Sequence, residues 1–222
     1  MIVLLNFVPI FIFVIVRAYW SRRKFLRRDS YIRGFNLSPL LLKPLRTKHP
    51  QLSPQDCQSV AIGLQQFFMA YLHSGHRSVA MPSQVADDLW HEFILHTRDY
   101  HNFCTQAFGS YLHHTPATAL GNDRQQSAAG LQRCWRYTCK LEGVDPQSPT
   151  HLPLLFALDS KFMIVEGFRY LADCDSVRKL NSDGRENTRI HCGSDLGNGS
   201  SDSGDSSSGS DCGGGGCGGG GD

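Results

Sequence analysis

Residues 53–75 read SPQDCQSVAIGLQQFFMAYLHSG, and this stretch decides the fold class. Ser53 followed by Pro54 is typical of a helix start, with serine as the N-cap and proline in the first helical position. Apolar residues then recur at steps of three and four: Val60, Leu64, Phe67, Phe68, Tyr71 and Leu72. Because this spacing lines one side of an α-helix, the stretch predicts an amphipathic helix that ends at Ser74-Gly75.

The same helical pattern continues toward the C-terminus. Pro82-Ser83 predicts a second helix start, whose apolar face runs until Gly109. A third helix is predicted from about residue 123 to Gly143, and a Pro-rich loop follows at residues 146–153. The next stretch, LPLLFALDSKFMIVEGFRYL, predicts one or two short apolar elements split near Gly167. Since no alternation is long enough for a sheet, the fold class is predicted to be mostly α.

The two ends of the chain differ from this helical middle. Residues 1–20 form an apolar run long enough for a hydrocarbon core of about 30 Å. No lysine or arginine precedes the run and no cleavage site follows it, so it predicts an uncleaved transmembrane helix. Residues 21–35 are a basic juxtamembrane segment, and residues 36–180 are the compact helical domain. Residues 181–222, rich in Gly, Ser and Cys, predict a disordered tail.

Basic residues beside the apolar run predict a topology. They are Arg17, Arg22, Arg23, Lys24, Arg27 and Arg28. By the positive-inside rule, a single-pass chain would have its N-terminus outside and its body in the cytoplasm, where most of the eight thiols would be reduced. The basic segment predicts contact with anionic lipid. The formal net charge of +2 leaves the rest of the chain slightly acidic, which argues against nucleic acid as a partner.

Histidines mark the candidate functional site. Five of the ten lie in the stretch from Leu89 to His114, namely His91, His96, His101, His113 and His114. Imidazole and thiolate are ligands that zinc and iron prefer, so the predicted metal ligands are His91, Cys104, His113 and His114.

Helix geometry restricts how these ligands can meet. On an unbroken helix His91 points away from the apolar face, alongside Asp87 and Arg98, whereas Cys104 points with that face. The two would also lie about 20 Å apart along the axis. A helix break at Thr97, which can cap a new helix with Asp99 in its first turn, would let His91 and Cys104 face each other across a hairpin.

The same residues also fit purely structural roles, which include packing, capping and hydrogen bonding. His96 is expected to be buried and His101 to be a solvated surface residue. Trp90, Phe93 and Tyr100 are expected in the core, and isolated cysteines are expected to act as small buried hydrophobes.

Several enzyme signatures are incomplete. An HExxH zinc protease would need a second histidine four residues after His91, where Leu95 stands. The chain has no GxSxG nucleophile elbow, and its oligoglycine tail lacks the lysine of a phosphate-binding loop. These classes of enzyme are therefore not indicated.

Two functions stay open. The first is a membrane-anchored binding or scaffold module with a protein partner whose identity the sequence does not reveal. The alternative is a metal-dependent enzyme in which His91, Cys104 and His113 or His114 hold zinc or iron. Glu92 or Asp88 would then be the general base.

Parts of the chain resemble known families. The runs DDLWHEFILHTRDYHNFCTQAFGSYLHHTP, LPLLFALDSKF and GFRY, with the Cys/Gly-rich end, resemble the bacterial glycine-rich domain-containing proteins over roughly residues 50–222. A second resemblance, to the W-H-x(3)-L-H-x(3)-Y-x-N-x-C pattern of plant glycine-rich domain proteins, is carried by Trp90, His91, Leu95, His96, Tyr100, Asn102 and Cys104. Proline tends to stand there at the position of Thr97, which suits the helix break. The bacterial family is membrane-anchored and uncharacterised, so the resemblance implies a fold, an anchor and a site location, but no reaction.

Overall fold

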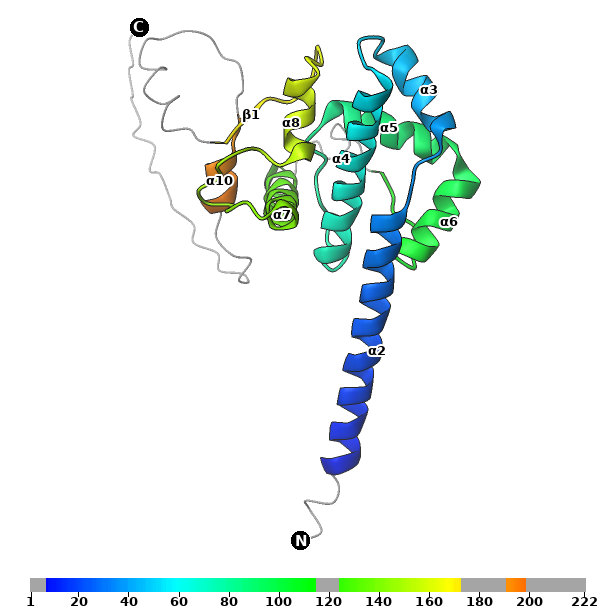
Figure 1. Cartoon of the computed structure of the whole chain (residues 1–222). Helices are drawn as coiled ribbons and strands as arrows, with labels where there is room; N and C mark the ends of the chain where they lie inside the picture. The colour runs from blue at the N-terminus through cyan, green and yellow to red at the C-terminus, as the bar shows by residue number, and fades with distance from the viewer. Residues whose placement is uncertain (1–6, 115–123, 173–190, 199–222) are drawn as a thin grey trace, which may run out of the picture.

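Helix α4 (Pro54–His73) lies at the centre of the structure, a computed structural model that describes residues 7–114, 124–172 and 191–198. Its start follows the prediction: the Ser53 hydroxyl accepts a hydrogen bond from the Asp56 N–H, and the Asp56 carboxylate accepts one from the Ser53 N–H. Several other helices contact α4 directly, and apolar residues of α4 such as Leu64 and Phe67 are fully buried between them. The described chain is thus a mostly helical, compact domain, as expected (Figure 1).

The helices around α4 also follow the predicted pattern. They are α3 (Pro39–Lys48), α5 (Gln84–Leu95), α6 (Thr97–Ala107), α7 (Arg124–Glu142) and α8 (Leu154–Lys161). The expected break between α5 and α6 is present, but its cap is His96 rather than Thr97, and no side chain caps α6. Gly109 and Gly143 follow α6 and α7 with positive φ angles of 75° and 71°. Glycine adopts this left-handed conformation without strain, which explains why the two helices end there.

A buried carboxylate far along the chain fixes the start of α5. Asp159 of α8 accepts hydrogen bonds from the Ser83 hydroxyl at 2.8 Å and from the backbone N–H groups of Gln84 and Val85. It also accepts one from the N–H of Phe168. Gly167 permits this approach, because a Cβ there would lie 2.6 Å from the Cβ of Asp159. The position of α5, which carries the candidate site, therefore depends on α8.

The C-terminal part of the described chain differs from the prediction. Two short strands, β1 (Tyr170–Leu171) and β2 (His191–Cys192), pair in parallel with Tyr170 opposite His191, and α10 (Gly193–Asn198) then packs against α7. Residues 191–198 were expected in the disordered tail, but Gly193 lets the backbone approach the buried Trp135 ring closely. Residues 181–190 and 199–222 lie outside the described part, so the prediction for them is not addressed.

The cysteines among the described residues divide into two groups. Cys57, Cys104, Cys134 and Cys139 are free and buried, as expected for small hydrophobic side chains. Cys192, in contrast, is disulfide-bonded. The expectation of reduced thiols therefore holds for the four buried cysteines and fails for this one.

Helix α2 (Phe7–Gly34) projects from the domain (Figure 1). Its inner end is fixed, because Ile32 is fully buried and the Gln65 side chain donates to the carbonyl oxygens of Ile32 and Arg33. In the part of the chain that the structure describes, no helix combines the length and apolarity needed to cross a bilayer. The predicted single-pass anchor, with its outside N-terminus and cytoplasmic body, is therefore wrong. Within α2 the uncharged run ends at Arg17, and the helix continues through the basic residues without a break.

Candidate metal centre

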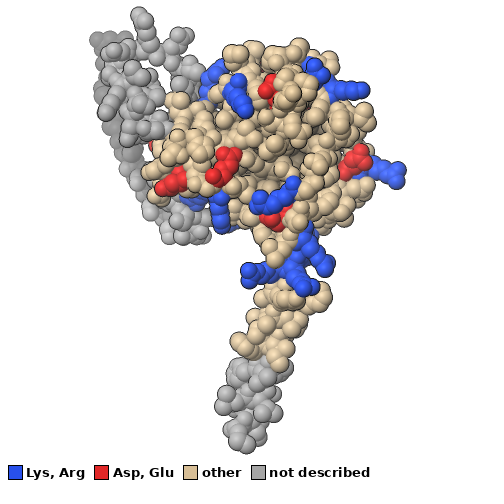
Figure 2. All heavy atoms as spheres, in the orientation of Figure 1, with Lys and Arg blue, Asp and Glu red and all other residues tan. Residues whose placement is uncertain are grey.

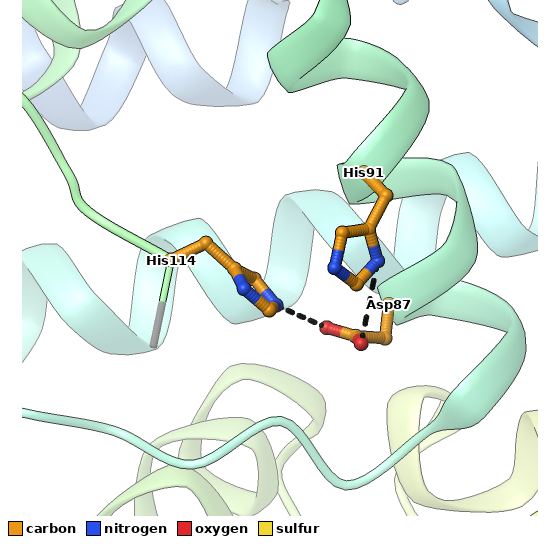
Figure 3. Close-up of side chains that lie close together, drawn as sticks. All are labelled: Asp87, His91 and His114. Atoms are coloured by element: carbon orange, nitrogen blue, oxygen red, sulfur yellow. Dashed lines mark hydrogen bonds and ion pairs between the residues drawn. The ribbon is translucent and has the colours of Figure 1, made fainter. Parts of the chain in front are cut away.

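Three side chains with metal-ligating atoms converge at the surface of α5. Asp87 and His91 stand on this helix, and His114 approaches from the segment after α6 (Figure 3). The Nε2 atom of His114 lies 2.9 Å from Oδ1 of Asp87, and the Nδ1 atom of His91 lies 3.5 Å from Oδ2. One potential ligand atom from each residue lies within 4.8 Å of the other two. We call this group the Asp87 cluster.

Local structure explains this convergence. Asp87 and His91 are four residues apart on one helix, so their side chains share a face. His114 is brought to that face by a buried chain of hydrogen bonds: Trp90 Nε1 donates to the Tyr100 hydroxyl, which donates to the Leu112 carbonyl at 2.6 Å. The His114 ring then packs edge-on against Trp90, with ring centroids 4.5 Å apart. The core thus positions a residue that the helix alone could not supply.

The Asp87 cluster borders a cavity of about 410 Å³. Asp87 and His114 contribute to its wall, and much of the remaining wall is aromatic, with Phe67, Tyr71 and Trp90 among its members. His76 also lines it, stacked on Tyr71 in a left-handed backbone conformation with φ of 65°. Burial lowers the pKa of His76, and the nearby charges of Arg28 and Lys24 lower it further. Such a cavity is large enough to admit a small molecule to the cluster.

The predicted ligands separate into two groups. His91 and His114 come together, whereas Cys104 and His113 are not part of any group of potential ligands within the described residues. Cys104 is completely buried on α6, and burial raises the pKa of its thiol, so it is protonated at neutral pH. His113 is exposed and its ring packs against Tyr111. The hairpin pairing of His91 with Cys104 is therefore not formed, because the apolar face of α6 buries Cys104 in the core.

The predicted ligand set omits Asp87, although its spacing from His91 is visible in the sequence. An Asp-x-x-x-His pair on a helix places both side chains on one face, and that was the available signal. His96 also departs from prediction, because it is exposed at the break between two helices rather than buried. His101 is exposed, as expected.

Asp88, one of the two suggested general bases, is occupied elsewhere. Its carboxylate is 5% exposed and accepts hydrogen bonds from Lys48 and His49, each at 2.7 Å, and from Gln84. Burial raises the pKa of the Asp88 carboxyl, but these hydrogen bonds outweigh burial and hold it below its ordinary value. This carboxylate is a fixed ion-pair partner. Glu92, the other suggested base, is half-buried next to His91.

The donor set of the Asp87 cluster has a definite chemical preference. Two imidazoles and one carboxylate suit zinc, and the same combination holds non-haem Fe(II) in sites that keep open coordination positions. Three protein ligands leave at least one such position, and the adjoining cavity would give a small molecule access to it.

Comparison with known proteins shows the family. Residues 27–196 match the UCP032817-like family, so the chain belongs to that family. The match covers the inner part of α2, the helical domain and most of α10. The resemblance to glycine-rich domain proteins is therefore wrong, since the family that matches is a different one. No curated protein and no solved structure matches the chain.

Proposed function

We propose that this protein is a binding module that holds one divalent transition metal ion, zinc or Fe(II), between Asp87, His91 and His114. One observation carries the proposal: a single carboxylate faces two imidazole nitrogens at 2.9 and 3.5 Å. In a tetrahedral zinc site, bonds of roughly 2.1 Å place the ligand atoms roughly 3.4 Å apart. The two carboxylate–imidazole distances are near this spacing, but they run to different oxygens of Asp87, and one ligand atom from each residue lies within 4.8 Å of the other two. Binding an ion would therefore draw the three side chains closer together.

The partial exposure of the three ligand side chains supports a site that can exchange its ion with solvent. The side chains of Asp87 and His114 are 21% and 12% exposed, and that of His91 is 49% exposed. An ion can therefore enter from the His91 side without unfolding the domain. Loss of the shared proton from the His114–Asp87 hydrogen bond would accompany binding, because a metal-bound imidazole nitrogen carries no proton.

A second candidate function is a metal-dependent enzyme, and the cavity beside the cluster favours it. An ion with three protein ligands can activate water or polarise a ligand at its open position. Asp88 is excluded as the general base by its buried ion pairs. Glu92 is the remaining suggested base for this alternative.

Titration of the metal-free full-length chain tests the proposal. Calorimetry with zinc, and with Fe(II) under anaerobic conditions, should show one ion per chain. His91→Ala, His114→Ala and Asp87→Asn should each weaken binding at least roughly tenfold, since each removes one of three ligands. Two matched controls, His101→Ala and His113→Ala, should bind as the wild type does.

Two results would contradict the proposal. One is a chain that takes up neither ion. The other is uptake that survives all three cluster substitutions and is lost in Cys104→Ser, which would place the ion elsewhere.

A further inference from the structure

The outer part of α2 presents an unusual apolar surface. Seven consecutive apolar residues, Ile10 to Val16, are each between 46% and 67% exposed. Because successive helical residues point in different directions, this run is apolar on every side rather than along one stripe. An amphipathic helix that docks in a protein groove has only one apolar face. Because this run is apolar on all faces, it fits an apolar environment that surrounds the helix.

A collar of cations follows this apolar run directly. It comprises Arg17, Arg22, Arg23, Lys24, Arg27 and Arg28, and no acidic residue precedes Asp29. Figure 2 shows these basic side chains gathered where the projecting helix meets the domain. Among the residues that the structure describes, none of the six forms an ion pair with a carboxylate. Asp29, the first carboxylate along α2, instead pairs with Arg33 and His73.

The collar also lines a hollow between α2 and the end of α6. Its volume is about 590 Å³, and five of the six collar cations border it, together with Trp20 of α2 and Thr105 and Gln106 of α6. Such a concentration of cations without carboxylate partners in the described part of the chain, beside hydroxyl and amide groups, suits a phosphate-bearing headgroup.

We propose that α2 docks on the surface of a bilayer that contains anionic phospholipid. The uncharged end of α2, residues 7–16, enters one leaflet while the collar contacts lipid phosphates. Ten residues rise about 15 Å along a helix, which is about half of the roughly 30 Å hydrocarbon core. Tyr19 and Trp20, both more than half exposed, follow Arg17 at the level where aromatic side chains favour the headgroup region. This surface association needs no helix that crosses the bilayer, and it is independent of the metal site.

Vesicle flotation of the full-length chain tests the docking. We expect binding to vesicles of equimolar phosphatidylcholine and phosphatidylserine, and much weaker binding to phosphatidylcholine alone. Each basic side chain near an anionic surface contributes about fivefold, so Arg17→Gln, Arg23→Gln and Arg27→Gln together should weaken binding roughly a hundredfold. The matched control removes three exposed cations elsewhere, Lys43→Gln, Arg46→Gln and Arg98→Gln, and should bind as the wild type does.

Tryptophan fluorescence reports which part of the chain meets the lipid. Trp20 is 64% exposed, whereas Trp90 and Trp135 are 4% and 0% exposed. A blue shift on adding mixed vesicles should therefore come from Trp20 and disappear in Trp20→Phe, although this variant should still float with the vesicles.

Four results would overturn the proposal. Equal binding to both vesicle types would remove the role of the collar, and equal losses in the two triple variants would show that only net charge matters. Suppression by millimolar inorganic phosphate alone, at constant ionic strength, would identify a site for the free ion. Self-association of lipid-free chain that Ile12→Asp abolishes, without vesicle binding, would show that a second copy covers the helix.

Discussion

Asp87 and Asp88 are neighbours on α5, and the carboxylate of each lies next to at least one histidine side chain. The surroundings of the two carboxylates nevertheless differ. Asp88 is 5% exposed and is held by Lys48, His49 and Gln84. Asp87 is 21% exposed, shares its two oxygens between His91 and His114, and borders a cavity. A carboxylate–histidine pair is therefore not a site in itself. Access and unused coordination capacity distinguish the candidate metal centre from an internal ion pair.

The Asp88 contacts have a clear structural purpose. Lys48 is the last residue of α3 and His49 is its C-cap, so the Asp88 carboxylate ties the C-terminal end of α3 to α5. Cationic side chains at a helix C-terminus also interact favourably with the helix dipole. The oxygens of Asp88 are already occupied by these hydrogen bonds, so a metal ion would find no free ligand atom here.

The largest expected effect is on folding stability. Asp88→Ala should lower the free energy of unfolding by about 3 kcal/mol, because it leaves the buried His49 ring without its acceptor. The contribution of Lys48 is small, since its side chain is 63% exposed. Urea denaturation of Asp88→Ala and Asp87→Ala, both metal-free, compares the two positions. Equal losses would show that the two carboxylates play the same structural role.

Zinc should stabilise the protein through the Asp87 cluster and not through Asp88. At a free concentration one hundred times the Kd, an ion that binds only the folded state raises the free energy of unfolding by about 2.7 kcal/mol. We expect this gain in the wild type and in His101→Ala, and its absence in His114→Ala. Thermal unfolding with and without zinc measures it. A gain that persists in His114→Ala would remove the Asp87 cluster from consideration.

Much of the helical fold could be predicted from sequence, because its signals are local. Ser53-Pro54 and the apolar spacing after it were sufficient for α4, and the break near Thr97 was sufficient to separate α5 from α6. The contact of Asp159 with the start of α5 could not be predicted, since it joins residues about 75 positions apart. The docking of α10 depends on close approach of Gly193 to Trp135, which a Gly-rich composition conceals.

The site was predicted in part for the same reason. His91 and His114 belong to a visible concentration of histidines. The hydrogen bond from Tyr100 to Leu112 and the packing of His114 on Trp90, which place His114 against α5, are tertiary contacts that the sequence does not reveal. The sequence left two roles open for Cys104, because a cysteine within an apolar pattern can be a metal ligand or a small buried hydrophobic side chain. Packing between helices, which the local sequence pattern does not specify, places Cys104 in the core.

The stabilisation that the Asp88 contacts provide should decrease gradually at acidic pH. The pKa of the Asp88 carboxyl lies below its ordinary value of 3.8, because its hydrogen bonds outweigh burial, which raises the pKa. Its contribution to stability is therefore complete above 3.8 and is lost as pH falls from there through the lower folded pKa. Urea denaturation across this range should show a shallower pH dependence for Asp88→Asn than for the wild type. Asp87→Asn is the control, and a slope as shallow as that of Asp88→Asn would contradict the assignment.

The smallest expected effect concerns His91 in metal-free protein, and it sharpens the comparison most. Its Nδ1 atom lies 3.5 Å from Asp87 and half of its side chain is exposed, so its interaction with the carboxylate is solvent-screened. His91→Ala should therefore change the free energy of unfolding by no more than about 0.5 kcal/mol without metal. With zinc present the same variant should fall short of the wild type by most of the gain from the ion. A small effect without zinc and a large effect with zinc would show that the main role of His91 is to bind the ion. A loss of equal size with and without zinc would instead make His91 a structural partner of Asp87, as His49 is of Asp88.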